Sequence, residues 1–521
     1  MKSEVSRGRM NRREFVQLAI AAGVTAVTAE SLFTTAARAE MKKGGTLRIG
    51  ISHGATTDSL DPATYPDQMT GTVCWGTAAN SLTEIDNKGN VQPDLAESYD
   101  SSDGAKKWAF KLRKGVTFHD GKPLTPADVV ASIKHHMGKD SKSAAKSVLA
   151  GVGDVAADGE NVVFALTGAN GDFPYLMSDY HLPICPAKAD GTMDWQSGNR
   201  TGPYKLDKFE PGVRAAMTRN PNYYRETNFD AVDFTVISDV AARTNALTTG
   251  EVDFIDRCDL KTVDLLKQNP DVEVDVQTGF GHYVFVMQTD KAPFTNPDVR
   301  NAIKFAIDRE AIAKKVFLGY ASPGNDNPIA PSITFATNPE PVHKYDPAMA
   351  KSLLKKAGLD SLSFDISVAD AAFPGAVDAA QLFKDSAAAA GITVNVIKEA
   401  NDSYWDVVWL KKPFVASYWS GRPTADWMFA TAYAADAAWN DTDWKNPRFN
   451  ELLLTARSET DQAKRAAMYA EMQQLLHDDG GLINIVFNQY VNAHSKKVAH
   501  PEQGGNWDLD GMKIAQRWWM A

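Results

Sequence analysis

The sequence has few cysteines and lacks the motifs of the common redox, metal and nucleotide sites. Its 521 residues include three cysteines, Cys74, Cys185 and Cys258, and no two of them form CxxC. Neither an HExxH pair nor a P-loop is present. Redox, zinc and nucleotide chemistry are therefore unsupported, and we expect no cofactor and no metal site. We expect the three cysteines to be small buried side chains, with one disulfide plus a free thiol as the alternative.

Positive charge is also scarce. The formal net charge is −10, and because residues 1–39 carry six Lys/Arg and three Asp/Glu, the chain beyond them has a net charge of −13. Binding to nucleic acid requires a basic surface, and so does adhesion to an anionic bilayer. The charge balance therefore argues against both kinds of partner.

Long apolar runs are absent beyond the N-terminus. Residues 1–39 combine Arg12-Arg13, the apolar run LAIAAGVTAV and a final Ala37-Arg38-Ala39, which is the order of a cleaved secretory signal. The segment NRREFVQ predicts the twin-arginine route, with an ordinary Sec signal as the alternative. No cysteine follows the apolar run, so we expect no lipid anchor and a protein free in the periplasm.

The sequence contains little that suggests catalysis. Its carboxylates are scattered, so the sequence does not indicate a catalytic acid/base pair. GISHG, at Gly50–Gly54, matches the G-x-S-x-G of a nucleophile elbow and makes a secreted serine hydrolase a distant alternative. That motif needs a helix directly after its strand, whereas a polar loop follows here. We expect a protein that is not an enzyme.

Strand and helix patterns alternate along most of the chain, which is long enough for more than one core. Turn pairs such as Asp103-Gly104 and Asp158-Gly159 predict hairpins, and Thr125-Pro126 with Asp128 predicts a capped helix. Apolar residues after Asn296-Pro297 repeat at the spacing of an amphipathic helix. A mixed α/β fold is predicted, with a second, more helical half.

Tryptophan is concentrated in one segment. Six of the twelve tryptophans lie between Asn401 and Lys445, in sequence broken by glycine and proline. Such aromatic density on loops is typical of a ligand cleft, although an aromatic-rich lobe is the alternative. Within this segment, YWSGRPTADW places the single Arg422 between Trp419 and Trp427.

Five segments, in order, resemble extracytoplasmic solute-binding proteins of family 5, the peptide, opine and nickel-chelate receptors of ABC importers. The resemblance covers about residues 43–500. The segments that carry it are GGTLRIG with DSLDPATY, WAFKLRKGVTFHDGKPLTPADVVAS, TGPYKLDKFEPG with RNPNYY, APFTNPDVRNAIKFAIDREAI with LGYASPG, and YDPAMAKSLLKKAG.

The resemblance implies an α/β type II periplasmic-binding-protein fold, with two hinged lobes and a third, inserted region. Its boundaries would be 1–39 for the signal, 41–74, 195–284 and 486–521 for lobe I, 75–194 for the inserted region, and 285–485 for lobe II. Two crossings, near Tyr283–Gln288 and Ile485–Tyr490, would form the hinge. A monomer would close on a small solute and deliver it to an inner-membrane ABC permease.

The resemblance also implies ligand-binding residues. Dipeptide-type members follow a Trp-x-Gly with an acid that pairs with the ligand's amino group, whereas Trp419-Ser420-Gly421 is followed here by Arg422. Arg422 would suit a ligand carboxylate, with Trp419 and Tyr418 as an aromatic wall. The alternative for Arg422 is a surface salt bridge to Asp426.

Two acids complete the predicted site. Asp370 stands where dipeptide-type members place a carboxylate-binding arginine, so both charges would be exchanged. Asp58 follows the first strand, on a loop that borders the cleft in the family. An exposed loop acid is the alternative for Asp370, and capping or turn formation is the alternative for Asp58. The implied ligand is a short peptide, an opine or a modified amino acid with a carboxylate, and a metal chelate or haem is the alternative.

Overall fold

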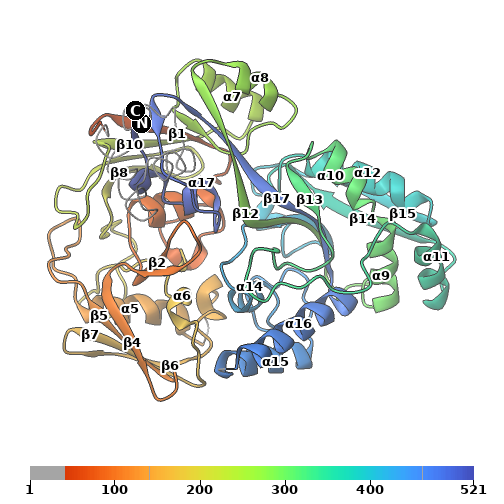
Figure 1. Ribbon diagram of the computed structural model, residues 1–521, viewed down its shortest axis with the longest axis horizontal. Coiled ribbons are helices and arrows are strands. Elements are labelled where there is room, and N and C mark those ends of the chain that lie inside the picture. Colours follow the sequence, from red (N-terminus) through yellow and green to blue (C-terminus); the bar gives the residue numbers. More distant parts are fainter. Residues whose placement is uncertain (1–41, 140, 460) are drawn as a thin grey trace, which may run out of the picture.

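A computed structural model describes residues 42–139, 141–459 and 461–521, and shows two lobes side by side with a smaller region beneath the first (Figure 1). The predicted signal segment, residues 1–39, lies outside the described residues. Among the described helices, none combines the length and the apolarity that a membrane span requires.

One mixed sheet of eleven strands runs through both lobes, in the order β15-β14-β16-β12-β17-β11-β1-β10-β9-β8, with β13 paired to β17. In the first lobe β1 is parallel to both β10 and β11. The strands of this lobe are β1 (Thr46–Ile51), β8 (Tyr204–Glu210), β9 (Arg214–Arg219), β10 (Ala231–Val236) and β11 (Phe254–Ile255), with helices α7 (Val240–Thr248) and α8 (Val263–Gln268).

The first strand, β1, is a central strand of the first lobe. In TLRIGI the side chains of Leu47, Ile49 and Ile51 are fully buried, and β1 has a parallel neighbour on each side. A central parallel strand is covered on both faces, so β-branched residues suit it. Strand β1 therefore lies in the middle of the first-lobe sheet.

Two long strands, β12 (Val272–Met287) and β17 (Leu482–Ser495), join the lobes. They pair with each other in antiparallel register on both sides of an irregularity between Thr278 and His282. Gly279 lies in that irregularity, where a Cβ would stand 2.3 Å from the ring of Tyr490. A residue with a side chain does not fit, so the sequence sets where the strand pair bends. The exact lobe boundaries stay a prediction.

The second lobe has its own core. Nearly all its buried apolar residues fall between Tyr283 and Val486 and form one cluster. The elements of this lobe are β13 (Ala321–Pro323), β14 (Leu362–Val368), β15 (Ile392–Lys398), β16 (Phe414–Trp419), α9 (Pro297–Ala306), α10 (Arg309–Lys315), α11 (Pro347–Lys356), α12 (Ala376–Ala388), α13 (Tyr404–Val407), α14 (Ala425–Ala432), α15 (Pro447–Ser458) and α16 (Gln462–Asp479). The predicted amphipathic helix is α9, which buries Val299, Ala302, Ile303 and Ala306.

The smaller region carries an antiparallel sheet in the order β4-β5-β7-β6, packed against α5 (Pro126–Met137). The predicted capping box is present, since the Asp128 carboxylate accepts from the Thr125 backbone N–H at 2.8 Å. The remaining strands and helices of this half are β2 (Thr83–Ile85), β3 (Val91–Pro93), β4 (Ala96–Ser102), β5 (Lys107–Leu112), β6 (Val152–Asp158), β7 (Asn161–Leu166), α4 (Gln68–Thr70) and α6 (Phe173–Leu176).

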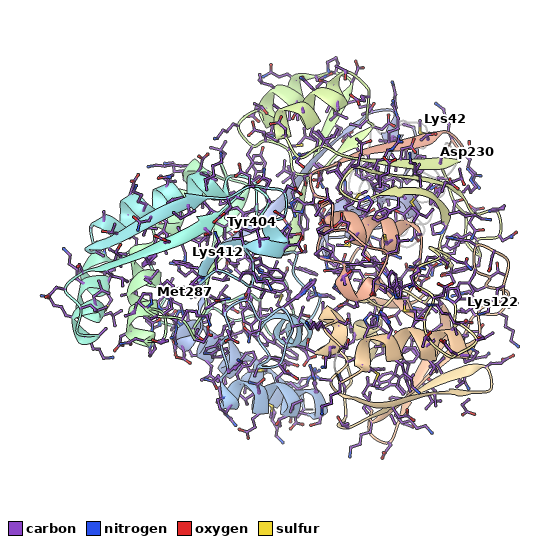
Figure 2. All side chains as sticks on the ribbon, turned by 180° about the vertical axis from the view of Figure 1, so that it is seen from behind. Lys42, Lys122, Asp230, Met287, Tyr404 and Lys412 are labelled. Atoms are coloured by element: carbon purple, nitrogen blue, oxygen red, sulfur yellow. The ribbon has the colours of Figure 1, made fainter. Side chains whose placement is uncertain are left out.

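The C-terminal segment returns to the first lobe as β18 (Val498–Ala499), α17 (Asp508–Gly511), α18 (Ile514–Arg517) and β19 (Trp519–Met520). Lys42 donates its backbone N–H to the Met520 carbonyl, so the two ends of the described chain lie together. Seen from behind, Lys42, Asp230 and Lys122 lie in one half of the molecule, and Met287, Tyr404 and Lys412 in the other (Figure 2).

Some expectations from the sequence are corrected. Tyr418 and Trp419 end strand β16, and Trp427 lies in α14, so the stretch YWSGRPTADW is a strand-turn-helix segment and not a loop. Trp427 is fully buried. The three cysteines are free and buried, as expected, and the alternative of a disulfide is wrong.

Candidate functional site

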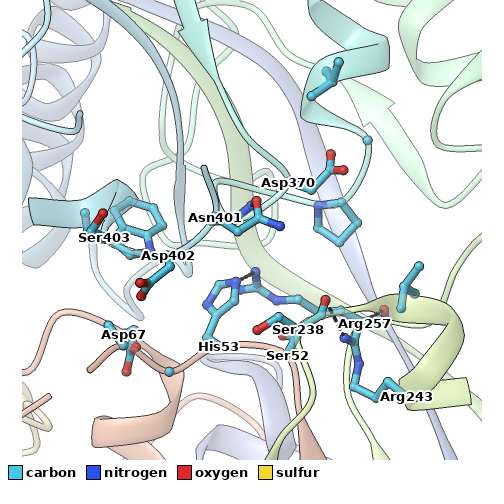
Figure 3. Close-up of a pocket in the computed structure, with 18 of the residues that line it drawn as sticks. Ser52, His53, Asp67, Ser238, Arg243, Arg257, Asp370, Asn401, Asp402 and Ser403 are labelled. Carbon is cyan, nitrogen blue, oxygen red and sulfur yellow. Dashed lines mark hydrogen bonds between the residues drawn. The ribbon is translucent and has the colours of Figure 1, made fainter. Parts of the chain in front are cut away.

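A cavity of about 600 Å³ lies between the lobes, where parallel strands end (Figure 3). In the first lobe, Ser52 and His53 follow β1, Ser238 follows β10 and Arg257 follows β11. In the second lobe Asp370 follows β14, and Asn401, Asp402 and Ser403 follow β15. The carboxyl ends of parallel strands share one edge of a sheet, and ligand sites of open α/β sheets form there.

Arg257 is the central cation of the cavity. Only 8% of it is exposed, yet it lines the cavity, and its guanidinium lies 4.6 Å from the centre of the Tyr418 ring. Its nearest carboxylate atom, Asp508 Oδ2, is 3.9 Å from Nε. Arg257 has φ +46°, in the left-handed region that few residues with a side chain adopt. A buried guanidinium without a close carboxylate is suited to an anionic ligand.

His53 accompanies Arg257. Arg257 Nη1 lies 2.7 Å from His53 Nε2, and because an arginine can only donate, Nε2 accepts and the imidazole proton is on Nδ1. This buried Nδ1 has no hydrogen-bond partner within the described chain. Burial, followed by the charges of Arg257 and Arg243, lowers the pKa of His53 well below its usual value. A neutral imidazole with an unused N–H thus stands beside the guanidinium.

Carboxylates occupy the opposite wall. Asp370 and Asp402 are exposed on second-lobe loops that line the cavity, and Figure 3 shows Asp370 above the Arg257–His53 pair. Cations predominate among the charged lining residues of the first lobe, and carboxylates predominate among those of the second. They are Arg243, Arg257 and Lys261 with Asp67 and Asp259 in the first lobe, and Asp370, Asp378, Asp402 and Asp406 with Lys398 in the second. A molecule with separated charges of both signs fits this arrangement.

The lobes are in contact around the cavity. Thr57 Oγ1 donates to Asp406 Oδ2 at 2.8 Å, and Lys261 Nζ lies 2.8 Å from Asp378 Oδ2. In each pair the first residue belongs to the first lobe and its partner to the second. The structure therefore shows the lobes closed on each other.

Four of the five predicted ligand residues do not line the cavity. Asp370 does. Tyr418 lies under Arg257, with its ring 5.4 Å from that of Trp405, a lining residue. Trp419 is 4% exposed and packs between Trp409 and Trp439, with ring centroids 6.4 and 6.0 Å away. The predicted aromatic wall is thus one layer behind the lining.

Arg422 is buried, with 2% of its surface exposed, and does not line the cavity. Its Nη1 donates to the Gly421 carbonyl at 2.7 Å, its guanidinium lies 5.8 Å from the rings of Tyr180 and Trp427, and its Nε has no hydrogen-bond partner among the described residues. The alternative of a surface salt bridge to Asp426 is wrong, because Asp426 binds Arg457 at 2.8 Å.

Asp58 lies behind the cavity, where its carboxylate accepts from the Ala55 N–H at 3.0 Å. This contact stabilises a turn, which is the alternative role that the sequence allowed for Asp58. The carboxylate is 6% exposed. Burial and then the charge of Asp67 raise the pKa of Asp58 to about 8.

The raised pKa gives a pH prediction. In the folded state Asp58 keeps a proton up to about pH 8, whereas the unfolded chain loses it near pH 4. Stability should therefore fall as pH rises from about 4 to about 8. Replacing Asp58→Asn removes this proton linkage, so we expect a flatter dependence of Tm on pH and a higher Tm at pH 8, measured by scanning calorimetry. The same replacement at the exposed Asp154 should change neither quantity, and an unchanged Asp58→Asn profile would contradict the prediction.

Ser52 does not have the surroundings of a nucleophile. Its hydroxyl donates to Asp256 Oδ2 at 2.6 Å, and β1 is followed by a loop that reaches only a short 3-10 turn at Pro62–Thr64. The strand-turn-helix of a nucleophile elbow is not formed here. GISHG supplies His53 to the cavity instead.

Two lobes joined by a pair of strands, closed on a cavity lined in part by charged side chains, define a solute-binding protein of the type II periplasmic fold. The model of bacterial extracellular solute-binding proteins, family 5, matches residues 90–441. The chain belongs to this family, whose members are extracytoplasmic binding proteins and not enzymes.

Known proteins agree with this assignment. The glutathione-binding protein GsiB of Pectobacterium atrosepticum is 26% identical over 505 residues, which cover 92% of this chain and 94% of that protein. Helicobacter pylori DppA in complex with the peptide STSA has a TM-score of 0.83 at 23% identity, covering 93% of this chain and all of that one. AgaA of A. tumefaciens R10 with agropinic acid has a TM-score of 0.81 at 24% identity, covering 92% and 99%. These structures show that the fold is shared.

Sequence reasoning missed Arg257 and His53. His53 follows β1 and Arg257 follows β11, each after one intervening residue, and these two short strands pair in parallel. The motif GISHG points to Ser52 as a nucleophile and contains no signal for the histidine beside it. The rule that ligands bind at the carboxyl ends of parallel strands would have pointed to both residues once the pairing was assumed.

Proposed function

We propose that this chain is the periplasmic receptor of an ABC importer for a zwitterionic solute, a short peptide or a peptide-like molecule such as glutathione or an opine. The observation that carries the proposal is the division of charge in the cavity. Arg257, whose guanidinium also donates to His53, offers its remaining donors to a carboxylate, and Asp370 and Asp402 would face an ammonium group across the gap. The arrangement would also discriminate, because a ligand lacking either charge leaves a partly buried group unpaired.

The size of the cavity supports the same class of ligand. Pockets for small molecules have volumes of about 300–1,000 Å³, and this one has about 600 Å³. The curated relative is named for glutathione and the similar structures hold a peptide and an opine. All three ligands are derived from amino acids, so each brings at least one carboxylate.

Closure would link binding to transport. The contacts Thr57–Asp406 and Lys261–Asp378 form only when the lobes meet, and a solute that touches both walls favours that state. An inner-membrane permease would recognise the closed monomer, and the twin-arginine signal of residues 1–39 would direct export. In this function the protein performs no catalysis.

A metal-chelate or haem receptor of the same family is the second candidate, and it has less support. Among the described residues that line the cavity, His53 is the only histidine, and its Nε2 already accepts from Arg257. A chelated metal would therefore find no free imidazole nitrogen lone pair there.

The proposal is tested by a ligand screen on the purified protein. Binding to the folded state adds RT ln(1 + [L]/Kd), about 2.7 kcal/mol at a hundredfold excess over Kd, so a true ligand raises the unfolding temperature. We expect glutathione, dipeptides or opines to raise it, and polyamines and sugar acids, which carry one sign of charge, to have no effect. Calorimetric titration of each hit should give one site per chain. Stabilisation by polyamines alone would overturn the charge argument.

A further inference from the structure

A cluster of two histidines and one aspartate lies in the first lobe, outside the cavity. Asp275 is on β12, His494 is on β17 and His500 follows β18, and one ligand atom from each lies within 4.8 Å of the others. Asp275 is paired with Asn492 in the ladder between β12 and β17. His494 is two residues further along β17, so it projects on the same side of the sheet as Asp275.

The hydrogen bonds of the histidines leave a lone pair on each ring. His494 Nδ1 lies 3.0 Å from the Ser495 carbonyl, and His500 Nδ1 lies 2.7 Å from the Pro501 carbonyl. A carbonyl can only accept, so the ring proton is on Nδ1 and Nε2 carries the lone pair in the neutral form. Backbone carbonyls hold metal-binding histidines in this tautomer in many proteins.

Both lone pairs point at the Asp275 carboxylate. His494 Nε2 lies 3.4 Å from Oδ2, and His500 Nε2 lies 3.3 Å from Oδ1. His494 is 2% exposed, and neither its Nε2 nor Asp275 Oδ2 has a hydrogen-bond partner in the described chain. The Gln503 amide can donate to His500 Nε2, but no group in the described chain donates to His494 Nε2 or Asp275 Oδ2. These two electron-rich atoms repel each other unless a cation stands between them.

We propose that Asp275, His494 and His500 bind a divalent transition-metal ion, with Zn²⁺ as the best fit. Imidazole and carboxylate together suit Zn²⁺, whereas Mg²⁺ and Ca²⁺ require oxygen ligands. Bonds of about 2.0–2.1 Å in a tetrahedron place the ligand atoms about 3.3 Å apart. His494 Nε2 is already at about that distance from Asp275 Oδ2, and His500 Nε2 is at about that distance from the other oxygen, Oδ1.

The residues around the three ligands fit a structural metal site, one that stabilises the fold. Trp518 stacks on His500 with ring centroids 4.4 Å apart and meets His494 edge-on at 5.1 Å. Gln503 Nε2 lies 3.3 Å from His500 Nε2, so rotating this amide would present its oxygen as a fourth ligand. A metal here ties the C-terminal segment to both strands that join the lobes.

The test is titration of the metal-stripped protein, purified without a polyhistidine tag, with Zn²⁺ by calorimetry. We expect one site per chain, a rise in Tm with Zn²⁺, and no response to Mg²⁺ or Ca²⁺. Co²⁺ should develop the visible absorption of a tetrahedral site. His500→Gln, at the more exposed ligand, should weaken Zn²⁺ binding at least tenfold while solute binding in the cavity stays unchanged.

The matched control is His135→Gln. His135 Nε2 lies 2.7 Å from Asp61 Oδ1, so this is also a His–Asp pair, but no third ligand joins it among the residues that the structure describes. This variant should bind Zn²⁺ as the wild type does. No heat with Zn²⁺, or equal affinities for wild type and His500→Gln, would overturn the proposal, and the first outcome would mean that a protonated histidine alone balances Asp275.

Discussion

Replacing Arg257→Ala should weaken binding of an anionic or zwitterionic solute by at least about thirtyfold. Removing one partner from a buried, hydrogen-bonded charge pair costs about 2 kcal/mol or more, and every 1.4 kcal/mol is a factor of ten. Arg257→Lys keeps the positive charge but loses the paired N–H donors of the guanidinium. Its dissociation constant should therefore lie between those of the wild type and the alanine variant. Calorimetric titration with the best ligand of the screen measures all three dissociation constants.

Arg422→Ala is the informative comparison. Both arginines are buried, but Arg257 lines the cavity and Arg422 does not. We expect Arg422→Ala to change the dissociation constant much less than Arg257→Ala. If Arg422→Ala weakened binding more than Arg257→Ala, Arg422 would be the residue that binds the ligand carboxylate, as the resemblance implied. Because Arg257 also supports His53 and Tyr418, the Tm of each empty variant should be measured to separate loss of binding from loss of folding.

Replacing Asp179→Ala should destabilise the protein by about 3 kcal/mol, because a buried carboxylate with several partners is removed and its partners stay buried. Asp179 Oδ1 lies 2.7 Å from His181 Nδ1, and Oδ2 accepts from Trp427 Nε1 at 3.0 Å. Trp427 belongs to α14 of the second lobe, and Asp179 to the smaller region of the first half. The loss should appear as a lower Tm in scanning calorimetry.

The pKa of Asp179 gives the pH dependence of this contact. Burial by itself raises the pKa, but the charge and hydrogen bonds of His181, with Arg422, outweigh it and lower the pKa to about 2. The contribution of the ionised Asp179 to the free energy of unfolding is therefore complete above about pH 4 and is lost as pH falls through about 2. Asp179→Asn, which keeps an acceptor for Trp427, should destabilise less. Glu471→Ala, which breaks an exposed pair with Arg448, should leave Tm unchanged, and an equal effect of all three variants would contradict the argument.

Local signals predicted much of the fold. The capping box at Thr125, the proline-started helix at Asn296 and the Asp-Gly turns are short-range features, and each lies where the sequence indicated. The segment Gly71–Thr77 was missed because it forms a π-helix, a geometry without a residue pattern of its own. Strand β16 was missed because its continuous run FVASYW stands between glycine- and proline-rich segments.

The candidate site was harder to predict because its residues come from separate strands. The resemblance to the family, aligned position by position, indicates Asp370 as a site residue, and Asp370 lines the cavity. Arg422 lies beside tryptophans in the sequence, yet its charge helps to lower the pKa of Asp179, which is some 240 positions away in the chain. Which arginine lines the cavity depends on how distant segments of the chain pack together. A local sequence pattern does not contain that information.

The pairing of β12 with β17 on both sides of their irregularity restricts how the molecule can open. Hydrogen-bonded strands can twist and flex about a short glycine-containing stretch, but they cannot slip past each other without breaking the whole ladder. We therefore expect opening to be a rotation with a single main angle. One pair of dyes, one on each lobe, should report the entire transition as one distance that shortens when solute is added.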